Sequence, residues 1–309
     1  MEHNNFSASD GCRLTFQSSL PLAASHGQKL CILLMHGFSG SSEYFKLNSP
    51  EIGKERWVVA PDMRGHGRSD HTPGGYHVAR LAADLRELIK FLRATAGTGL
   101  KFVPVGCSIG AAVIWTFLEL FGCDDFAGLV FVDQAPLQNR SPRDNWDEKK
   151  AHFSCYDART TEAAQYAWTR DTENTHRGLV RDCLGYYQKA WAGPRPSPEK
   201  QQLDMDFFTK ISAACDAEWL ALLLADHTAY DHREALELVT VPTLVMMGRY
   251  SGCFSLDGMR EIVRRANQGQ DKVLATESIF EAGHWLFYEE PERFNAEIMA
   301  FSESALGST

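Results

Sequence analysis

The feature that most constrains the fold of this chain is a recurring pattern. A short apolar run ends in Gly, Asp or Pro, and a longer helical pattern follows. The runs occupy residues 29–35, 56–60, 100–105, 129–132, 243–247 and 272–280. Their length and their content of Val, Ile, Leu and Phe are typical of strands that are buried on both faces of a parallel sheet. Strands alternating with helices predict an α/β fold, with a mostly parallel central sheet flanked by helices.

One long segment interrupts this alternation. About a hundred residues separate Asp133 from the strand expected at Thr243, and they show helical patterns without a strong strand. A loop of that length without structure would be unusual in a compact domain. We therefore expect residues 1–136 and 236–309 to form one core, and residues 137–235 to form a helical cap inserted in it. A linker-joined second domain is the weaker alternative, because GPRPSP at 193–198 is the only linker-like stretch.

Composition narrows the partners and the compartment. The net charge of −9 is spread along the chain, and an acidic surface repels nucleic acid and anionic membranes, so neither is an expected partner. The polar N-terminus lacks the apolar region of a secretory signal, and no apolar run is long enough to span a bilayer. The eight cysteines are scattered without a C-x-x-C pair, which indicates reduced thiols and a cytoplasmic protein.

The strongest chemical signal is the G-x-S-x-G motif at residues 106–110, which lies directly after an expected strand and directly before a helical pattern. In this context the motif predicts a nucleophile elbow, a tight turn that raises the Ser108 hydroxyl above the sheet. Glycines are needed on both sides because side chains there would collide with neighbouring backbone. Cys107 precedes the apex, and we interpret it as a small core residue rather than a rival nucleophile.

Two further motifs supply partners for Ser108. His36-Gly37-Phe38 closes a strand about seventy residues before the elbow, where the Phe38 N–H could pair with the Ile109 N–H to form an oxyanion hole. A plain turn at the strand end is the alternative. His284 follows the last expected strand and a glycine, so it is the expected general base that takes the Ser108 proton and returns it to the leaving group.

Taken together, five segments resemble the α/β-hydrolase superfamily: HGFSGS, PDMRGHGRSD, GCSIG, DHREALELVTVPTLVMMG and AGHWLFYEEPERF. The resemblance covers nearly the whole core but not the cap. It implies the α/β-hydrolase fold and a serine hydrolase activity. It also implies a structural role for Asp231 and Arg233 as a D-x-R pair. That role is favoured over a metal role for His227 and His232, which lack further ligands at useful spacing.

The sequence departs from the superfamily in the position of the triad acid. Members usually carry it in a G-x-x-D loop after the penultimate strand, but the corresponding residue here is Ser251, and Asp257 lies too far along. A variant layout, found in some haloalkane dehalogenases and zearalenone-type lactonases, places the acid after the strand that follows the elbow helix. That position is Asp133, which the resemblance therefore implies as the acid. The alternative is that Asp133 only caps a turn.

The expected function follows from the serine nucleophile. A serine forms an acyl-enzyme, so we expect cleavage of a carboxylic ester or lactone without a metal or another cofactor. A carbon–carbon bond hydrolase acting on a diketone, or a non-catalytic small-molecule receptor, would keep the same residues. Trp146, Trp168 and Trp191 lie in the expected cap and are candidate substrate-binding residues for a bulky apolar or aromatic molecule, unless they pack the core of the cap itself.

Overall fold

The computed structural model describes residues 1–307 and is built on one eight-stranded sheet. The strands follow the order β1-β2-β4-β3-β5-β6-β7-β8, in which β4, β3 and β5 to β8 run parallel and β1 and β2 run antiparallel to their neighbours. The strands are β1 (Glu2–Ser7), β2 (Arg13–Ser18), β3 (Leu30–Met35), β4 (Trp57–Pro61), β5 (Lys101–Cys107), β6 (Leu129–Val132), β7 (Thr243–Gly248) and β8 (Ala275–Phe280). The mostly parallel sheet is therefore confirmed.

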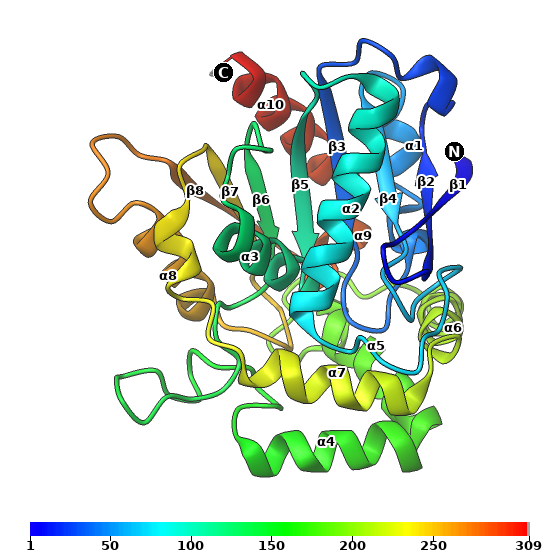
Figure 1. The fold of residues 1–309 in the computed structure, drawn as a ribbon. Coiled ribbons are helices and arrows are strands. Elements are labelled where there is room, and N and C mark those ends of the chain that lie inside the picture. The colour runs from blue at the N-terminus through cyan, green and yellow to red at the C-terminus, as the bar shows by residue number, and fades with distance from the viewer. Residues whose placement is uncertain (308–309) are drawn as a thin grey trace.

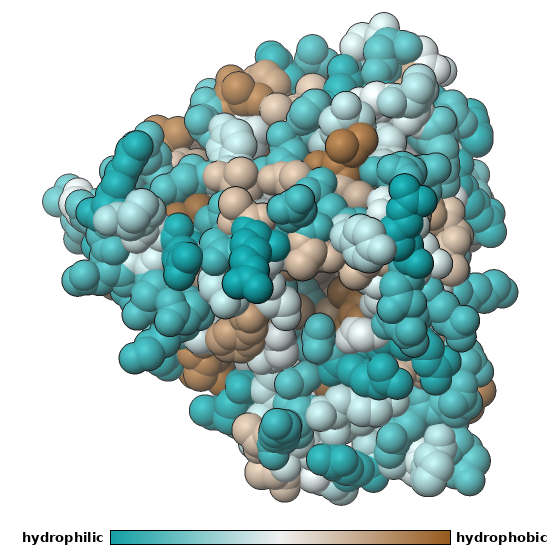
Figure 2. Space-filling model, turned by 90° about the horizontal axis from the view of Figure 1, so that it is seen from below, coloured by the Kyte–Doolittle hydropathy of each residue, from teal (hydrophilic) through white to brown (hydrophobic). Residues whose placement is uncertain are grey.

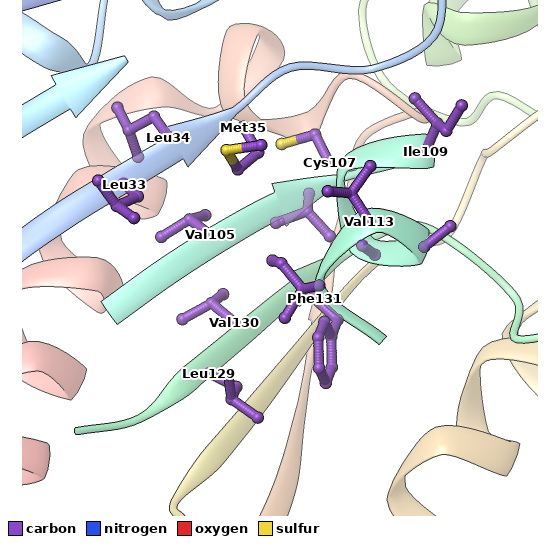
Figure 3. Packing of buried hydrophobic residues seen from close by; sticks show 14 of the residues in the cluster. Leu33, Leu34, Met35, Val105, Cys107, Ile109, Val113, Leu129, Val130 and Phe131 are labelled. Carbon is purple, nitrogen blue, oxygen red and sulfur yellow. The ribbon is translucent and has the colours of Figure 1, made fainter. Parts of the chain in front are cut away.

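The parallel strands form the centre of the hydrophobic core. Every residue of β3, β4, β6 and β7 is buried, as their continuous apolar runs predict. Figure 3 shows side chains of β3, β5 and β6 packed with those of the helix that follows β5. Cys107 is among them, and it is almost completely buried, in agreement with its interpretation as a core residue.

The hairpin formed by β1 and β2 was not expected from the sequence. Strand β1 reads EHNNFS, and Phe6 is its one buried residue, so it carries no apolar run of the kind found in the parallel strands. Six residue pairs nevertheless join β1 to β2, and β2 continues the sheet by pairing with β4. A strand at the edge of a sheet can be polar because its outer side faces water.

Helices cover both faces of the sheet (Figure 1). Helices α2 (Val78–Ala96), α3 (Ile109–Phe121) and α8 (Leu256–Ala266) lie on the face toward the viewer, where α2 packs against α3. Helices α1 (Ser49–Ile52), α9 (Leu286–Glu289) and α10 (Pro291–Gly307) lie behind it. Four short 3₁₀ helices complete the core and its loops: η1 (Leu22–Ala24), η2 (Ser42–Phe45), η3 (Gly185–Tyr187) and η4 (Ala235–Leu238).

The long segment between β6 and β7 is helical. It contains α4 (Ala158–Arg170), α5 (Thr172–Cys183), α6 (Pro198–Ala213) and α7 (Ala217–Ala229), which lie beneath the sheet in Figure 1, next to the carboxyl ends of the parallel strands. Helix α4 packs against α7, and α5 against α6. The ring of Phe208 on α6 stacks on Trp285 of the core with 3.8 Å between ring centroids, so this segment is anchored on the last part of the chain.

Two properties of the whole molecule bear on the expectations from composition. None of the helices within residues 1–307 is long and apolar enough to cross a membrane. All eight cysteines are free thiols, and seven of them are buried. Viewed from the side of α4 and α7, the surface is largely hydrophilic, with hydrophobic residues visible between the polar ones (Figure 2).

Candidate active site

Ser108 occupies the sharp turn between β5 and α3. Its φ of 53° lies in the left-handed region, where a non-glycine residue is strained, as a nucleophile elbow requires. The two glycines of the motif are needed for close packing. A Cβ on Gly106 would lie 2.6 Å from the Ala111 nitrogen, and one on Gly110 would lie 2.8 Å from the Met35 oxygen. The Ser108 Oγ faces the Gln134 side chain, 3.4 Å from its Oε1.

The loop after β3 lies against this elbow. A Cβ on Gly37 would lie 3.2 Å from the Ser108 Cβ, so the chain passes as close to the serine as a glycine allows. The loop is held by the buried His36, whose Nε2 accepts a hydrogen bond from the Met63 N–H at 3.0 Å. Ile109 is the first residue of α3, and N–H groups in the first turn of a helix have no partner within the helix. The structure therefore places Phe38 and Ile109 beside Ser108.

Asp133 and His284 are in direct contact. One carboxylate oxygen of Asp133, Oδ1, lies 2.6 Å from the Nδ1 of His284, and both side chains are buried. Asp133 is also the residue that directly follows β6, and its φ of 46° is again left-handed. This strained backbone turns the carboxylate from its own strand toward the loop after β8, which carries His284.

The loop after β7 supports Asp133 instead of replacing it. The Ser251 hydroxyl donates a hydrogen bond to Asp133 Oδ1 at 2.7 Å, and the Gly248 N–H donates to Oδ2 at 2.7 Å. Ser251 therefore holds the carboxylate from the position where relatives usually carry the acid itself. Asp257 lies in the first turn of α8, where its exposed side chain pairs with Arg260 at 3.5 Å.

Burial and hydrogen bonding act in opposite directions on Asp133. Burial raises the pKa of this carboxyl, whereas the hydrogen bonds from His284, Ser251 and Gly248 lower it. Burial by itself lowers the pKa of His284, but the negative charges of Cys253 and Asp133 outweigh it and raise this pKa to about 10. A hydrogen bond from Cys183 and the charge of His284 hold the pKa of the Cys253 thiol well below its usual value. His284 is therefore part of a charged network with an acid on one side and thiols on the other.

Glu289 fixes the loop that carries His284, a role that the sequence did not reveal. Its carboxylate accepts hydrogen bonds from the Gly283 N–H at 2.7 Å and from the Gly185 N–H at 3.0 Å. It thus joins the residue before the histidine to the inserted helices. Burial raises the pKa of Glu289 to about 7. A glutamate among the three acidic residues of the YEEPE stretch carries no sequence signal that singles it out.

A cavity of about 310 Å³ opens next to Ser108 and His284. Its walls come from the core and from the inserted helices, and they are mainly apolar. The residues that line it are Gly37, Phe38, Ser108, Gln134, Gln138, His152, Ser154, Cys155, Ala164, Ala167, Trp168, Thr175, Gly178, Leu179, Asp182, Cys183, Leu224, His227, Cys253, Phe254, His284 and Trp285. No lysine or arginine is among these lining residues of the described chain.

The three tryptophans expected to bind substrate are placed differently. Trp168 lines the cavity and meets the ring of Phe38 edge to face, with 5.2 Å between centroids. Trp146 does not line it, because its indole N–H donates to the Leu137 oxygen at 3.1 Å and its ring is buried. Trp191 packs on Tyr250, outside the cavity wall. For Trp146 and Trp191 the expectation is therefore corrected in favour of packing.

The remaining motif residues have structural surroundings. Arg233 binds both carboxylate oxygens of Asp231, at 2.8 Å and 2.7 Å, as expected of the D-x-R pair. His232 is buried and contacts the rings of Trp115 and Tyr230. His227 is buried too, but it lines the cavity, and its Nδ1 has no hydrogen-bond partner within the described residues.

The fold and this arrangement of Ser108, Asp133 and His284 at the strand ends define an α/β hydrolase. Comparison with known proteins agrees: the model of the "Alpha/beta hydrolase family" matches residues 32–297, and the chain belongs to that family. It is 24% identical over 281 residues to the AB hydrolase superfamily protein YisY of Bacillus subtilis, covering 90% of this chain and 93% of the relative.

Solved structures share the fold. An esterase from Exiguobacterium antarcticum superposes with a TM-score of 0.79 at 18% identity, covering 97% of this chain and 99% of the other. A thermophilic esterase from Thermogutta terrifontis superposes with a TM-score of 0.74 at 22% identity, covering 99% of both chains. At this level of identity the likeness establishes the architecture.

Proposed function

We propose that this protein is a serine hydrolase that cleaves a carboxylic ester or lactone through an acyl-enzyme. The observation that carries the proposal is the 2.6 Å contact between Asp133 Oδ1 and His284 Nδ1, at the end of a cavity that Ser108 also lines. With its Nδ1 proton held by Asp133, the imidazole presents Nε2 to the reacting groups. Ser108, His284 and Asp133 act as nucleophile, general base and acid.

The reaction then follows from the positions of these groups. His284 takes the proton of Ser108 as its Oγ attacks the substrate carbonyl, and the C–O bond to the alcohol breaks as His284 returns that proton to the leaving oxygen. The N–H groups of Phe38 and Ile109 stabilise the oxyanion. A water molecule, deprotonated by His284, then hydrolyses the acyl-enzyme. The strained φ of Ser108 keeps its Oγ exposed throughout.

The cavity supports a substrate that is uncharged and largely apolar. Residues such as Ala164, Leu179 and Phe254 provide apolar walls, and no cationic side chain is present to neutralise a substrate anion. A volume of about 310 Å³ is at the small end of ligand sites, which are usually 300–1,000 Å³. The inserted segment, residues 137–235, acts as the cap that supplies most of these walls. His227 and Gln138 are the polar groups available to orient the substrate.

The decisive experiment uses a fluorophosphonate probe and a panel of p-nitrophenyl esters and lactones. Wild type should be labelled and should hydrolyse members of the panel. Ser108→Ala should escape labelling and lose activity by about a millionfold, as expected for loss of a triad nucleophile. A labelled wild type that turns over a diketone but no ester would instead indicate carbon–carbon bond hydrolysis. A folded protein that reacts with neither probe nor substrate would contradict catalysis and favour a receptor.

Substrate size is tested at the cavity wall. Trp168→Ala enlarges the cavity, so it should favour long or aromatic acyl groups over acetate by roughly tenfold in relative kcat/KM, the scale of a few removed or added methylene-sized contacts. Trp191→Ala is the matched control, because Trp191 lies outside the wall. An equal change in both variants would contradict the role of Trp168.

A further inference from the structure

Two cysteines lie beside His284, on segments far apart in the sequence. Cys183 ends α5, Cys253 lies in the loop after β7, and the potential ligand atoms of both, together with a ring nitrogen of His284, are within 4.8 Å of one another. All three residues are buried. We propose that Cys183, Cys253 and His284 form a binding site for a thiophilic divalent cation, above all Zn²⁺, and that metal binding there switches the hydrolase off.

The distances are close to those of a tetrahedral zinc site. Zn–S bonds are about 2.3 Å long, so two sulfurs on a tetrahedral zinc ion are separated by roughly 3.8 Å. The Sγ atoms of Cys183 and Cys253 are 4.0 Å apart. A disulfide would require the sulfurs to approach to about 2.05 Å and an oxidant such as a peroxide to remove two electrons, whereas metal binding requires only small side-chain rotations.

His284 already has the orientation of a metal ligand. Its Nδ1 is bonded to Asp133 at 2.6 Å, which leaves Nε2 for a cation. A carboxylate that holds the other nitrogen of the ring is the common arrangement around metal-bound histidines, where it fixes the tautomer and raises the basicity of the ligand. The contact that we propose to support catalysis would therefore also support the metal.

The two cysteine positions are fixed by the backbone. The Cys183 carbonyl accepts a hydrogen bond from the Trp285 N–H at 3.1 Å, and the Cys253 N–H donates to the Ser251 hydroxyl at 3.2 Å. Both anchors therefore come from residues close to His284 or bonded to Asp133. Little reorganisation is needed to bring three ligands together, so the cost of binding is low.

The surroundings favour a cation and leave one coordination position open. Cys183, Cys253 and His284 all line the cavity, Asp182 adds a carboxylate to the same wall, and no lysine or arginine is among the lining residues of the described chain. Three protein ligands with an open fourth position are typical of zinc sites that accept water or a ligand. The expectation of a chain without a metal site came from sequence spacing, and these ligands have no regular spacing.

Binding and its effect on activity are separable. Metal binding does not depend on the proposed function, whereas inhibition rests on it, because the cation would occupy the nitrogen that must accept the proton of Ser108. A bound Zn²⁺ should therefore stop ester hydrolysis at one equivalent, and a chelator should restore it.

The test titrates reduced, desalted full-length protein with Zn²⁺ alone, in competition with a chromophoric chelator, and with Co²⁺ alone, read by its thiolate-to-cobalt charge-transfer band. Wild type and Ser108→Ala should bind one equivalent of either metal with equal affinity. Cys183→Ser and Cys253→Ser should each bind roughly a hundredfold more weakly or worse, because each loses a thiolate ligand. Asp133→Asn should weaken binding by about ten- to a hundredfold, as loss of the carboxylate behind a metal-bound histidine does.

Cys155→Ser is the matched control, because Cys155 is another buried cysteine of the same cavity that does not belong to the cluster. An equal loss in this control, no charge-transfer band, or a Cys183–Cys253 disulfide in the reduced protein would overturn the site. If Zn²⁺ binds in one equivalent and hydrolysis continues, the switch is overturned. If Zn²⁺ binds but wild type hydrolyses no substrate and escapes the fluorophosphonate, the site stands and the proposed function fails.

Discussion

The ends of β6 and β7 are neighbours in the sheet, yet they carry different chemistry. Val132 of β6 lies opposite Met246 of β7, and each strand then runs into a loop that meets the network around His284. The β6 end supplies the Asp133 carboxylate, and the β7 end supplies the Ser251 hydroxyl, which donates to it. A second carboxylate at residue 251 would repel the first and raise a pKa. The comparison teaches that the histidine needs one charge, which either strand end can supply when the other donates hydrogen bonds.

The largest effect should come from removing the charge at the β6 end. Asp133→Asn keeps the size of the side chain but presents an amide to His284, so we expect kcat/KM for an accepted ester to fall by roughly a thousandfold or more, as wrong-tautomer variants do. Circular dichroism and fluorophosphonate access should show that the fold and the cavity persist. Activity within tenfold of wild type would refute Asp133 as the acid.

The second prediction moves the charge from one strand end to the other. Asp133→Gly removes the carboxylate and suits the φ of 46° at this position, and Ser251→Asp adds a carboxylate within the same network. The double variant should recover at least about tenfold in kcat/KM over Asp133→Gly alone, because charge close to the imidazolium is restored. If both variants are equally slow, the two strand ends are not interchangeable.

The third prediction removes only the support from β7. Ser251→Ala deletes one hydrogen bond to a buried carboxylate, a loss of about 1–3 kcal/mol, so we expect activity to fall by roughly five- to a hundredfold. The lost bond lowers the pKa of Asp133 in the wild type, so this pKa should rise. A protonated Asp133 cannot support His284, and activity should therefore begin to fall at a higher pH on acidification. An unchanged pH–rate profile would contradict this.

The smallest effect is expected at Asp257. This residue is exposed on α8 and pairs with Arg260, away from the network. Asp257→Asn should therefore leave kcat/KM within about twofold of wild type, since exposed ion pairs contribute little. A loss comparable to that of Asp133→Asn would place the acid back in the loop after β7.

Sequence patterns were most informative where burial is complete on both faces. The apolar runs at 129–132 and 243–247 coincide with β6 and β7 to within one residue, because nothing but a buried strand combines such length with such composition. Strand β1 was missed for the opposite reason, since a polar edge strand is held by pairing with β2, and pairing leaves no local pattern.

For the site, position along the chain was enough to bring Ser108, Asp133 and His284 together, because the carboxyl ends of parallel strands meet at one edge of a sheet. The cluster of Cys183 and Cys253 could not be found in this way. The two residues are 70 positions apart, and their contact depends on how the inserted helices dock on the core. The same docking decides that Trp168 faces the cavity whereas Trp146 and Trp191 do not, and side-chain composition alone does not contain that information.

The insertion between β6 and β7 also determines how the protein can be made. Asp133 and His284 are 151 residues apart, so their contact must wait for almost the entire chain to leave the ribosome. Until β7 arrives, β6 presents an unpaired edge on a strand whose residues are all apolar. That edge is the most aggregation-prone surface of the nascent chain. Chaperones that shield it during synthesis of the inserted helices should therefore govern the yield of active enzyme.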